Sequence, residues 1–357
     1  MSFKGIFLGL GIALLGLSAP VMARDGAVLA KAQGIAYPAV IAHRGASFDA
    51  PESTAPAYAL ARDLGADYLE LDLQRSSDGV LVVVHDNDLH RTSDVAERFP
   101  ERKDSPVSAF TLAELKSLDA GSWFNQAYPE RARAAFAGLK VLTLEEVMDI
   151  AEANPALRPG LYIETKVPNL FPGIEQDLRR ALQARGWLDV PGRVVLQSFD
   201  RDSLALLHTA MPQVPKVLLL WLGKGHIEPM PGPTFAESGE RDKAAFLARQ
   251  HPRDRAEFER WLDHAKAAGA VGVGPSAALA AGGEQSYADL VQPWMNRMAH
   301  DKGLLVHVYT VDEAVDFQRA SDAGVDGIFT NRTGALLRFY GRGVPQDEAI
   351  LLKSGGY

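Results

Sequence analysis

Nine short runs rich in apolar and β-branched residues alternate with helical stretches along this chain of 357 residues, and this alternation is the strongest constraint on its fold. The runs are residues 39–43, 68–73, 80–85, 160–165, 194–198, 216–221, 271–274, 304–309 and 325–329. Strands that alternate with helices predict a parallel sheet whose strands are joined by crossover helices.

The third run, residues 80–85, is too close to the second to be its parallel neighbour. Only six residues separate Leu73 from Val80, and they include the Asp78-Gly79 pair that is typical of a hairpin turn. A parallel crossover needs about a dozen residues or more. The run is therefore predicted to fold back as a hairpin arm. Eight parallel strands remain, the number that closes a (β/α)₈ TIM barrel of the α/β class.

Helical spacing is readable between several of these runs. Thr143 followed by Glu146 forms a capping-box pattern at the start of one helix. Four more helices are expected at residues 53–64, 173–185, 202–209 and 312–323. The barrel domain is expected to span residues 38–340, after a lead-in at 24–37 and before a C-terminal tail at 341–357.

Two stretches within this domain exceed ordinary strand-to-helix connections. Residues 87–140 follow the hairpin of the second strand, and residues 223–258 are rich in proline, glycine and charge. Long insertions in barrels usually lie over the functional face. We therefore expect a small capping insertion at 87–140 and a second insertion at 223–258.

The first 23 residues have the pattern of a secretory signal peptide. Lys4 precedes an apolar run at residues 6–17, and Val21-Met22-Ala23 resembles a small-residue cleavage site. The alternative, a membrane anchor, is disfavoured because the run falls short of the roughly 20 residues that span a bilayer. We expect export with cleavage after Ala23, a periplasmic or secreted location, and no stable membrane insertion afterwards.

Net charge and cysteine content limit which partners the protein can bind and how its fold can be stabilised. The formal charge of −8 becomes −9 once Lys4 is removed with the leader, which makes nucleic acid an unfavourable partner. Cysteine is absent, so no disulfide bond can stabilise the exported chain, and its stability must come from its hydrophobic core. The remaining 334 residues are enough to bury a large hydrophobic core. The sequence does not determine an oligomeric state.

Carboxylates gather near the ends of two of the expected strands. Glu70 and Asp72 share one face of the second strand, and Glu164 shares a face of the run at 160–165 with Tyr162 and Lys166. These three carboxylates can converge on one point, and an all-oxygen cluster suits Ca²⁺ or Mg²⁺. The alternative is a salt-bridged network with Arg44 and Lys166 as the cations.

Two histidines end neighbouring strands at the same mouth. His43 ends the first strand and His85 ends the hairpin arm, so the two imidazoles can divide general acid and general base work. With a metal, Arg44 and Lys166 would complete an anion site suited to a phosphate. His307 is a weaker candidate for the pocket lining.

Taken together, seven motifs resemble those of the glycerophosphodiester phosphodiesterase family. They are H-R-G at 43–45, P-E-S-T at 51–54, E-L-D at 70–72, V-V-V-H-D at 82–86, I-E-T-K at 163–166, Q-S-F at 197–199 and H-V-Y-T-V-D at 307–312. The resemblance runs from about residue 38 to residue 335. It implies a barrel enzyme that cleaves glycerophosphodiesters such as glycerophosphocholine to sn-glycerol 3-phosphate and an alcohol.

The resemblance also implies roles for particular residues. The divalent cation would lie on Glu70, Asp72 and Glu164, with His43 and His85 as acid and base. The segments around residues 92–100 and 110–124 resemble the exported branch, which is often calcium-dependent, so Ca²⁺ is favoured over Mg²⁺. The side chains expected to bind substrate are Arg44, Lys166, Glu52, Ser198 and Tyr309.

Three residues depart from the family pattern. Tyr309 stands where many members have Trp, Ser53 where Asn is commoner, and Asn331 where Asp often follows the last strand. These positions lie on the pocket wall and the barrel end, so they affect the preferred alcohol more than the chemistry.

The expected reaction begins with attack by the glycerol hydroxyl next to the phosphoester. One histidine takes its proton, the other protonates the departing alcohol, and water then opens the cyclic phosphate. Either histidine could be the first base. Two alternatives remain: phospholipase D-like cleavage of lysophospholipids at the same site, and a binding protein that holds a phosphate ester without cutting it.

Overall fold

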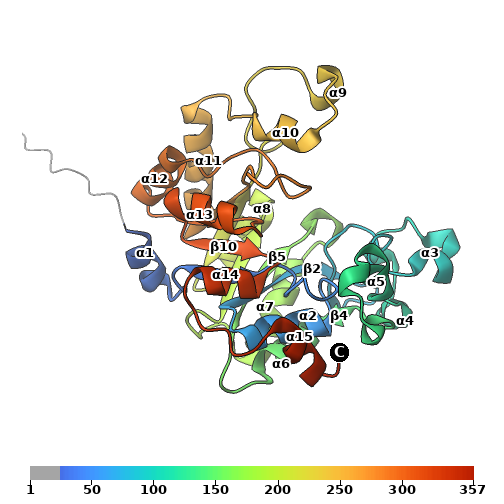
Figure 1. Ribbon diagram of the computed structural model, residues 1–357. Helices are drawn as coiled ribbons and strands as arrows, with labels where there is room; N and C mark the ends of the chain where they lie inside the picture. Colours follow the sequence, from blue (N-terminus) through green and yellow to red (C-terminus); the bar gives the residue numbers. More distant parts are fainter. Residues whose placement is uncertain (1–24) are drawn as a thin grey trace, which may run out of the picture.

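The computed structural model describes residues 25–357 (Figure 1). The expected signal peptide lies outside the described residues. Within them, no helix has the length and apolar character needed to span a bilayer.

Eight parallel strands close a barrel, as the sequence predicts. In order around the barrel they are β1 (Ala39–Ala42), β2 (Tyr68–Arg75), β5 (Gly160–Thr165), β6 (Val194–Ser198), β7 (Lys216–Leu220), β8 (Gly272–Pro275), β9 (Leu305–Val308) and β10 (Gly327–Thr330). The pairing of β1 with both β10 and β2 closes the ring. The (β/α)₈ barrel is therefore confirmed.

The predicted hairpin is also present. Strand β3 (Leu81–Val83) pairs antiparallel with β2, opposing Val83 to Leu73. A two-residue strand that the sequence analysis did not foresee, β4 (Leu142–Thr143), pairs antiparallel with β3. The hairpin therefore forms a small arm beside the barrel, and His85 follows directly from it.

One helix follows each barrel strand and covers its outer face. These helices are α2 (Ala55–Leu64), α6 (Leu144–Glu152), α7 (Ile174–Arg185), α8 (Arg201–Ala210), α11 (Arg255–Ala267), α12 (Pro293–Asp301), α13 (Ala314–Asp322) and α14 (Thr333–Phe339). Thr143 and Glu146 form the expected capping box at the start of α6. The other expected helices begin one or two residues from the predicted positions, because residues such as Thr54 occupy cap positions with extended backbone.

Alternation along the strands separates an inner layer from an outer one. Ile41, Tyr68, Tyr162, Val195 and Phe329 pack together inside the barrel. Their neighbours along the strands contact the helices outside. The polar side chains of the site stand above the inner apolar layer, on the same strand faces.

The two insertions form separate structures over the barrel (Figure 1). Residues 87–140 contain α3 (Val95–Arg98), α4 (Leu112–Ser117), α5 (Ser122–Ala127) and four short 3₁₀ turns, and their apolar residues form a satellite core with Val82 and Val84. Residues 223–258 contain α9 (Phe235–Ser238), α10 (Lys243–Ala248) and the start of α11.

Helices also lie near both ends of the described chain. In the lead-in, α1 (Gly26–Gln33) contributes Ala30 to the inner core at the foot of the barrel. In the tail, α15 (Glu348–Ser354) adds Leu352 to the outer core.

Candidate active site

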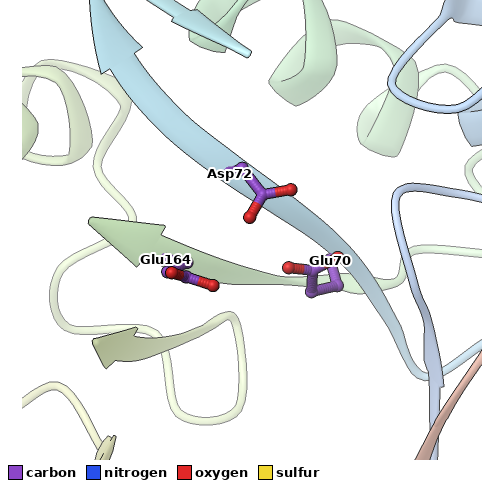
Figure 2. A group of neighbouring side chains, drawn as sticks. All are labelled: Glu70, Asp72 and Glu164. Atoms are coloured by element: carbon purple, nitrogen blue, oxygen red, sulfur yellow. The ribbon is translucent and has the colours of Figure 1, made fainter. Parts of the chain in front are cut away.

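Three carboxylates from two adjacent strands converge at the barrel mouth. Strands β2 and β5 pair in register, so that Asp72 lies opposite Glu164 and Glu70 lies one side-chain step below on the same face. One oxygen from each carboxylate lies within 4.8 Å of the others. Figure 2 shows Glu70 and Asp72 on β2 and Glu164 on its neighbour. The three side chains are at least 94% buried, with exposed fractions of 2%, 1% and 6% respectively.

Burial and mutual repulsion disturb the protonation of this cluster. Burial, and then the charge of Asp72, raises the pKa of Glu70 well above its usual range. Burial raises the pKa of Glu164 to about 7, against the opposing effect of Lys166. Burial also disfavours ionised Asp72, but Lys166, His85 and Arg44 lower its pKa. Three buried carboxylates are therefore held together without enough positive charge to keep all of them ionised.

The local cations neutralise the cluster only in part. Lys166 Nζ lies 3.1 Å from Glu164 and 3.5 Å from Asp72, and Arg44 Nε lies 3.3 Å from Asp72. Among the described residues, Gln197 Oε1 is a buried acceptor without a hydrogen-bond partner, and Asp72 Oδ2 has only its 3.3 Å ion-pair contact with Arg44 Nε. Buried acceptors with so few donors beside three carboxylates fit a hard cation. Glu70, Asp72 and Glu164 could thus hold a metal ion.

His43 is oriented by an amide that the last barrel strand supplies. Its Nδ1 atom lies 2.8 Å from Asn331 Oδ1, and Asn331 Nδ2 donates to Asp312 at 2.7 Å. Since the amide nitrogen faces a carboxylate, the amide oxygen is the end that accepts from His43. Burial, followed by the nearby Arg44 charge, lowers the pKa of His43 to about 3. His43 is therefore neutral, with its proton on Nδ1 and a lone pair on Nε2.

His85 is paired with a carboxylate instead. Its Nδ1 atom lies 2.6 Å from Asp86, which also binds Arg91 through two hydrogen bonds. Burial lowers the pKa of His85, and the charge of Asp72 opposes that effect. The Asp86 carboxylate fixes the ring and favours its protonated form.

The backbone conformation at residues 44 and 45 orients His43 and Arg44 toward the three carboxylates. Arg44 has a positive φ of 56°, and its backbone N–H donates to Glu70 at 2.8 Å. Gly45 has φ of 85°, and a Cβ there would lie 2.6 Å from the Ala57 carbonyl carbon. Only glycine fits this close approach to α2. The strand thus ends in a tight turn that aims His43 and Arg44 at the carboxylates.

A cavity of about 980 Å³ contains nearly all of the expected site residues. Its lining includes His43, His85, Glu70, Asp72, Glu164, Arg44, Lys166, Glu52 and Tyr309. Glu52 is held by Arg44 at 3.0 Å and by Arg91 at 2.8 Å. Four residues of the first insertion also line the cavity: Arg91, Trp123, Tyr128 and Arg131.

The structure does not bring Ser198 to this cavity. Its side chain is fully buried and donates to the Thr165 carbonyl at 3.2 Å. On β6, the side chain of Ser198 points to the outer face of the barrel, as those of Val194 and Leu196 do. Gln197 points inward, and its amide donates to Glu70 at 3.3 Å. Gln197 therefore occupies the position that was expected for Ser198.

His307 also lies outside the cavity lining. It faces the barrel interior as expected, but it is fully buried, with Nδ1 2.9 Å from the Tyr162 hydroxyl. It belongs to the packed layer below the site.

Four residues that contact the expected site were given no role in its chemistry from the sequence. Asn331, Asp86, Gln197 and Arg91 each contact a residue that was expected there. The strand alternation was a usable signal for Gln197, and the V-V-V-H-D motif placed Asp86 beside His85. Asn331 and Arg91 come from distant loops, and only the folded chain shows their contacts.

A TIM barrel with carboxylates, two histidines and two cations at its carboxyl-terminal mouth defines a class of barrel enzymes acting on anionic esters. Comparison with known families identifies the family within this class. Residues 43–230 and 240–335 match the model of the glycerophosphoryl diester phosphodiesterase family. The chain belongs to this family.

Curated relatives agree with that assignment, and a solved structure shares the fold. The chain is 38% identical over 294 residues to a glycerophosphodiester phosphodiesterase of Bacillus subtilis, covering 82% of each chain. It is 30% identical to one of Caldanaerobacter subterraneus, covering 85% of this chain and 98% of the relative. An Oleispira antarctica phosphodiesterase solved with the product sn-glycerol-3-phosphate has the same fold, with a TM-score of 0.60 at 22% identity, over 85% of this chain and 97% of its own.

Proposed function

We propose that this enzyme hydrolyses glycerophosphodiesters, such as glycerophosphocholine, to sn-glycerol 3-phosphate and an alcohol. The observation that carries the proposal is the convergence of His43, His85 and three carboxylates on one cavity in a member of this family. The relatives named above are phosphodiesterases of this substrate class.

We further propose that Glu70, Asp72 and Glu164 hold one divalent cation, with Ca²⁺ favoured over Mg²⁺. Such an ion would polarise a phosphoryl oxygen as a Lewis acid and add positive charge to the site. Two buried acceptor atoms support this proposal: Arg44 and Lys166 leave Gln197 Oε1 without a partner and contact Asp72 Oδ2 only through the 3.3 Å ion pair of Arg44 Nε.

His43 is the base in the first step of this mechanism. The Asn331 amide holds the proton on Nδ1, so Nε2 is free to accept one from the 2-hydroxyl of the substrate glycerol. The deprotonated oxygen attacks phosphorus in the same molecule, which makes the step effectively unimolecular. The imidazolium that forms on His43 keeps its hydrogen bond to Asn331.

His85 is the acid that protonates the departing alcohol. Its bond to Asp86 supports the imidazolium form, and the negative phosphodiester brought next to it raises its pKa from the lowered value of the free enzyme. In the second step the roles reverse: His85 takes a proton from water, which opens the cyclic phosphate, and His43 returns its proton to the glycerol oxygen.

Arg44 and Lys166 bind the phosphate and stabilise its growing charge. Glu52 positions Arg44 through their 3.0 Å ion pair and is itself fixed by Arg91. Burial disfavours ionised Glu52, but the two guanidinium groups prevail and lower its pKa to about 2. Tyr309 forms part of the pocket wall, with its hydroxyl turned away to donate to the Leu220 carbonyl at 2.9 Å.

Product analysis tests the proposed function directly. Metal-stripped protein is incubated with glycerophosphocholine, with Ca²⁺ or Mg²⁺ added back separately, and the products are separated by chromatography. We expect sn-glycerol 3-phosphate and choline in equal amounts with Ca²⁺. Release of phosphocholine, or no turnover with either ion, would contradict the proposal.

We also propose that the protein is exported and cleaved after Ala23, acting in the periplasm or outside the cell. The basic, apolar and small-residue segments of residues 1–23 support this. Amino-terminal sequencing of the protein from fractionated cells tests it. A mature chain that begins at Arg24 is expected, and recovery of an uncleaved cytosolic chain would contradict it.

A further inference from the structure

Arg91, from the first insertion, binds two carboxylates of the catalytic cavity at the same time. Its Nε and Nη2 atoms donate to the two oxygens of Asp86 at 2.7 and 3.0 Å. Its Nη1 and Nη2 atoms donate to the two oxygens of Glu52, both at 2.8 Å. The guanidinium therefore forms two parallel pairs of charge-assisted hydrogen bonds. We call this arrangement the Arg91 clamp.

Each carboxylate of the clamp also holds a residue that the proposed mechanism uses. Asp86 Oδ1, which accepts from Arg91 Nη2, lies 2.6 Å from His85 Nδ1. Glu52 Oε1, which also accepts from Arg91 Nη2, accepts from Arg44 Nη1 at 3.0 Å. One nitrogen of Arg91 thus joins the oxygen that orients the proposed acid to the oxygen that orients the phosphate-binding guanidinium.

The main chain around His85 is fixed without the help of Arg91. Gln74 is fully buried, and its amide donates to the Val84 and Asp86 carbonyls at 2.8 and 2.7 Å. The Asp86 carboxylate, in contrast, is 26% exposed, and its ion-pair partners among the described residues are His85 and Arg91. Removal of Arg91 would therefore leave the main chain in place and free this carboxylate to rotate.

We propose that Arg91 is a positioning residue that holds the general acid His85 toward the departing alcohol and in line with the phosphate bound by Arg44. This inference rests on the proposed function and adds a residue to the machinery of the same site. Without the clamp, Asp86 would no longer fix the ring of His85, and the proton on Nε2 would be displaced from the alcohol oxygen. A lysine cannot replace the clamp, because it lacks the planar fork that pairs with two carboxylates at once.

The dependence of the rate on the departing alcohol separates this role from a general loss of structure. Choline needs a proton to depart, whereas p-nitrophenolate departs without one. In Arg91→Ala, kcat/KM for glycerophosphocholine should fall on the order of a hundredfold, the contribution of a general acid. For the p-nitrophenyl ester of sn-glycerol 3-phosphate, it should fall no more than about tenfold, through the weaker hold on Arg44. The ratio kcat/KM is used because it reports only the steps up to release of the alcohol.

Two further variants separate the clamp from charge and folding. Arg91→Lys keeps the charge but cannot form both parallel pairs, so it should show the same selective loss at a smaller size. Arg98→Ala removes another arginine of the first insertion, one that is 49% exposed, pairs with Asp94 and lies outside the cavity lining. It should leave both rates unchanged. Equal losses on both substrates in Arg91→Ala, or near-parental rates in Arg91→Ala and Arg91→Lys, would overturn the inference.

A double-mutant cycle tests whether Arg91 acts through Asp86. Asp86→Ala should reproduce the selective loss on glycerophosphocholine. Adding Arg91→Ala to it should cost no more than about a further tenfold, because both changes remove the same contact to His85. Glu52→Ala should lower kcat/KM for both substrates alike, since it acts through Arg44. Fully additive losses for Asp86→Ala and Arg91→Ala would overturn the inference.

The tautomer of His85 covers the case in which the parent cleaves neither substrate, which would defeat the proposed function. It is measured by long-range proton–nitrogen NMR at alkaline pH, where the ring is neutral, and His85→Ala identifies the resonances. The Asp86 carboxylate only accepts, so the form with the proton on Nδ1 should predominate in the parent and in Arg98→Ala. A mixture of both forms in Arg91→Ala supports the clamp, and an unchanged tautomer overturns it.

Discussion

His43 Nδ1 lies 2.8 Å from Asn331 Oδ1, so a residue at the end of the last barrel strand determines which nitrogen of the first strand's histidine is free. Asn331 is itself held by Asp312, which accepts from both its amide nitrogen and its backbone N–H at 2.7 Å. This chain of contacts distinguishes the two histidines, because His85 is paired with a carboxylate instead.

Replacing Asn331 tests this positioning role. Asn331→Ala removes the acceptor for the His43 Nδ1 proton, so the ring can rotate or change tautomer. We expect kcat to fall on the order of a hundredfold, as for a misplaced reacting group, with little change in KM. Asn331→Asp keeps an acceptor and should lose less. Steady-state kinetics that show a rise in KM alone would contradict the role.

Removing either histidine tests the acid and base pair. His43→Ala and His85→Ala should each reduce turnover of glycerophosphocholine by at least about a hundredfold, the range of general acid or base groups. His90→Ala is the control, since His90 is exposed outside the cavity lining. Circular dichroism would verify that the variants fold. A near-parental rate in either single variant would refute the pairing.

The barrel and most of its site were predictable because strand geometry is local and periodic. Alternation on β2 and β5 placed Glu70, Asp72 and Glu164 on one face, and the register of Asp72 with Glu164 follows once those strands are neighbours. The same alternation places Gln197, and not the expected Ser198, on the inner face of β6. The Asn331 contact was not predictable, because it depends on how β10 and β1 align when the ring closes.

The free energy of unfolding should depend on pH through His300, which lies in the last turn of α12. Its Nε2 atom lies 2.8 Å from buried Asp326. Burial alone would lower the pKa of His300, but the hydrogen bond to Asp326 prevails and raises it. A raised folded pKa means that this stabilisation is complete below the unfolded value, about 6.5, and is lost as pH rises through the folded value.

His300→Gln should therefore cost more stability in acid than in alkali. We expect a loss of about 1 kcal/mol at a pH of about 6 and less at a pH of about 9, measured by urea unfolding. His90→Gln changes an exposed histidine and serves as the control. A loss for His300→Gln that is larger at the higher pH would contradict the assignment.

Glu70, Asp72 and Glu164 are proposed to hold one cation beneath the two imidazoles. Isothermal titration of Ca²⁺ into the metal-stripped protein tests it most directly, with Glu164→Gln as the variant and Glu130→Gln, which alters a carboxylate that is 66% exposed, as the matched control. We predict one ion per chain in the parent and the control, and affinity at least about tenfold weaker in Glu164→Gln. Equal affinity in parent and Glu164→Gln, or no binding in the parent, would contradict a cation site on these carboxylates.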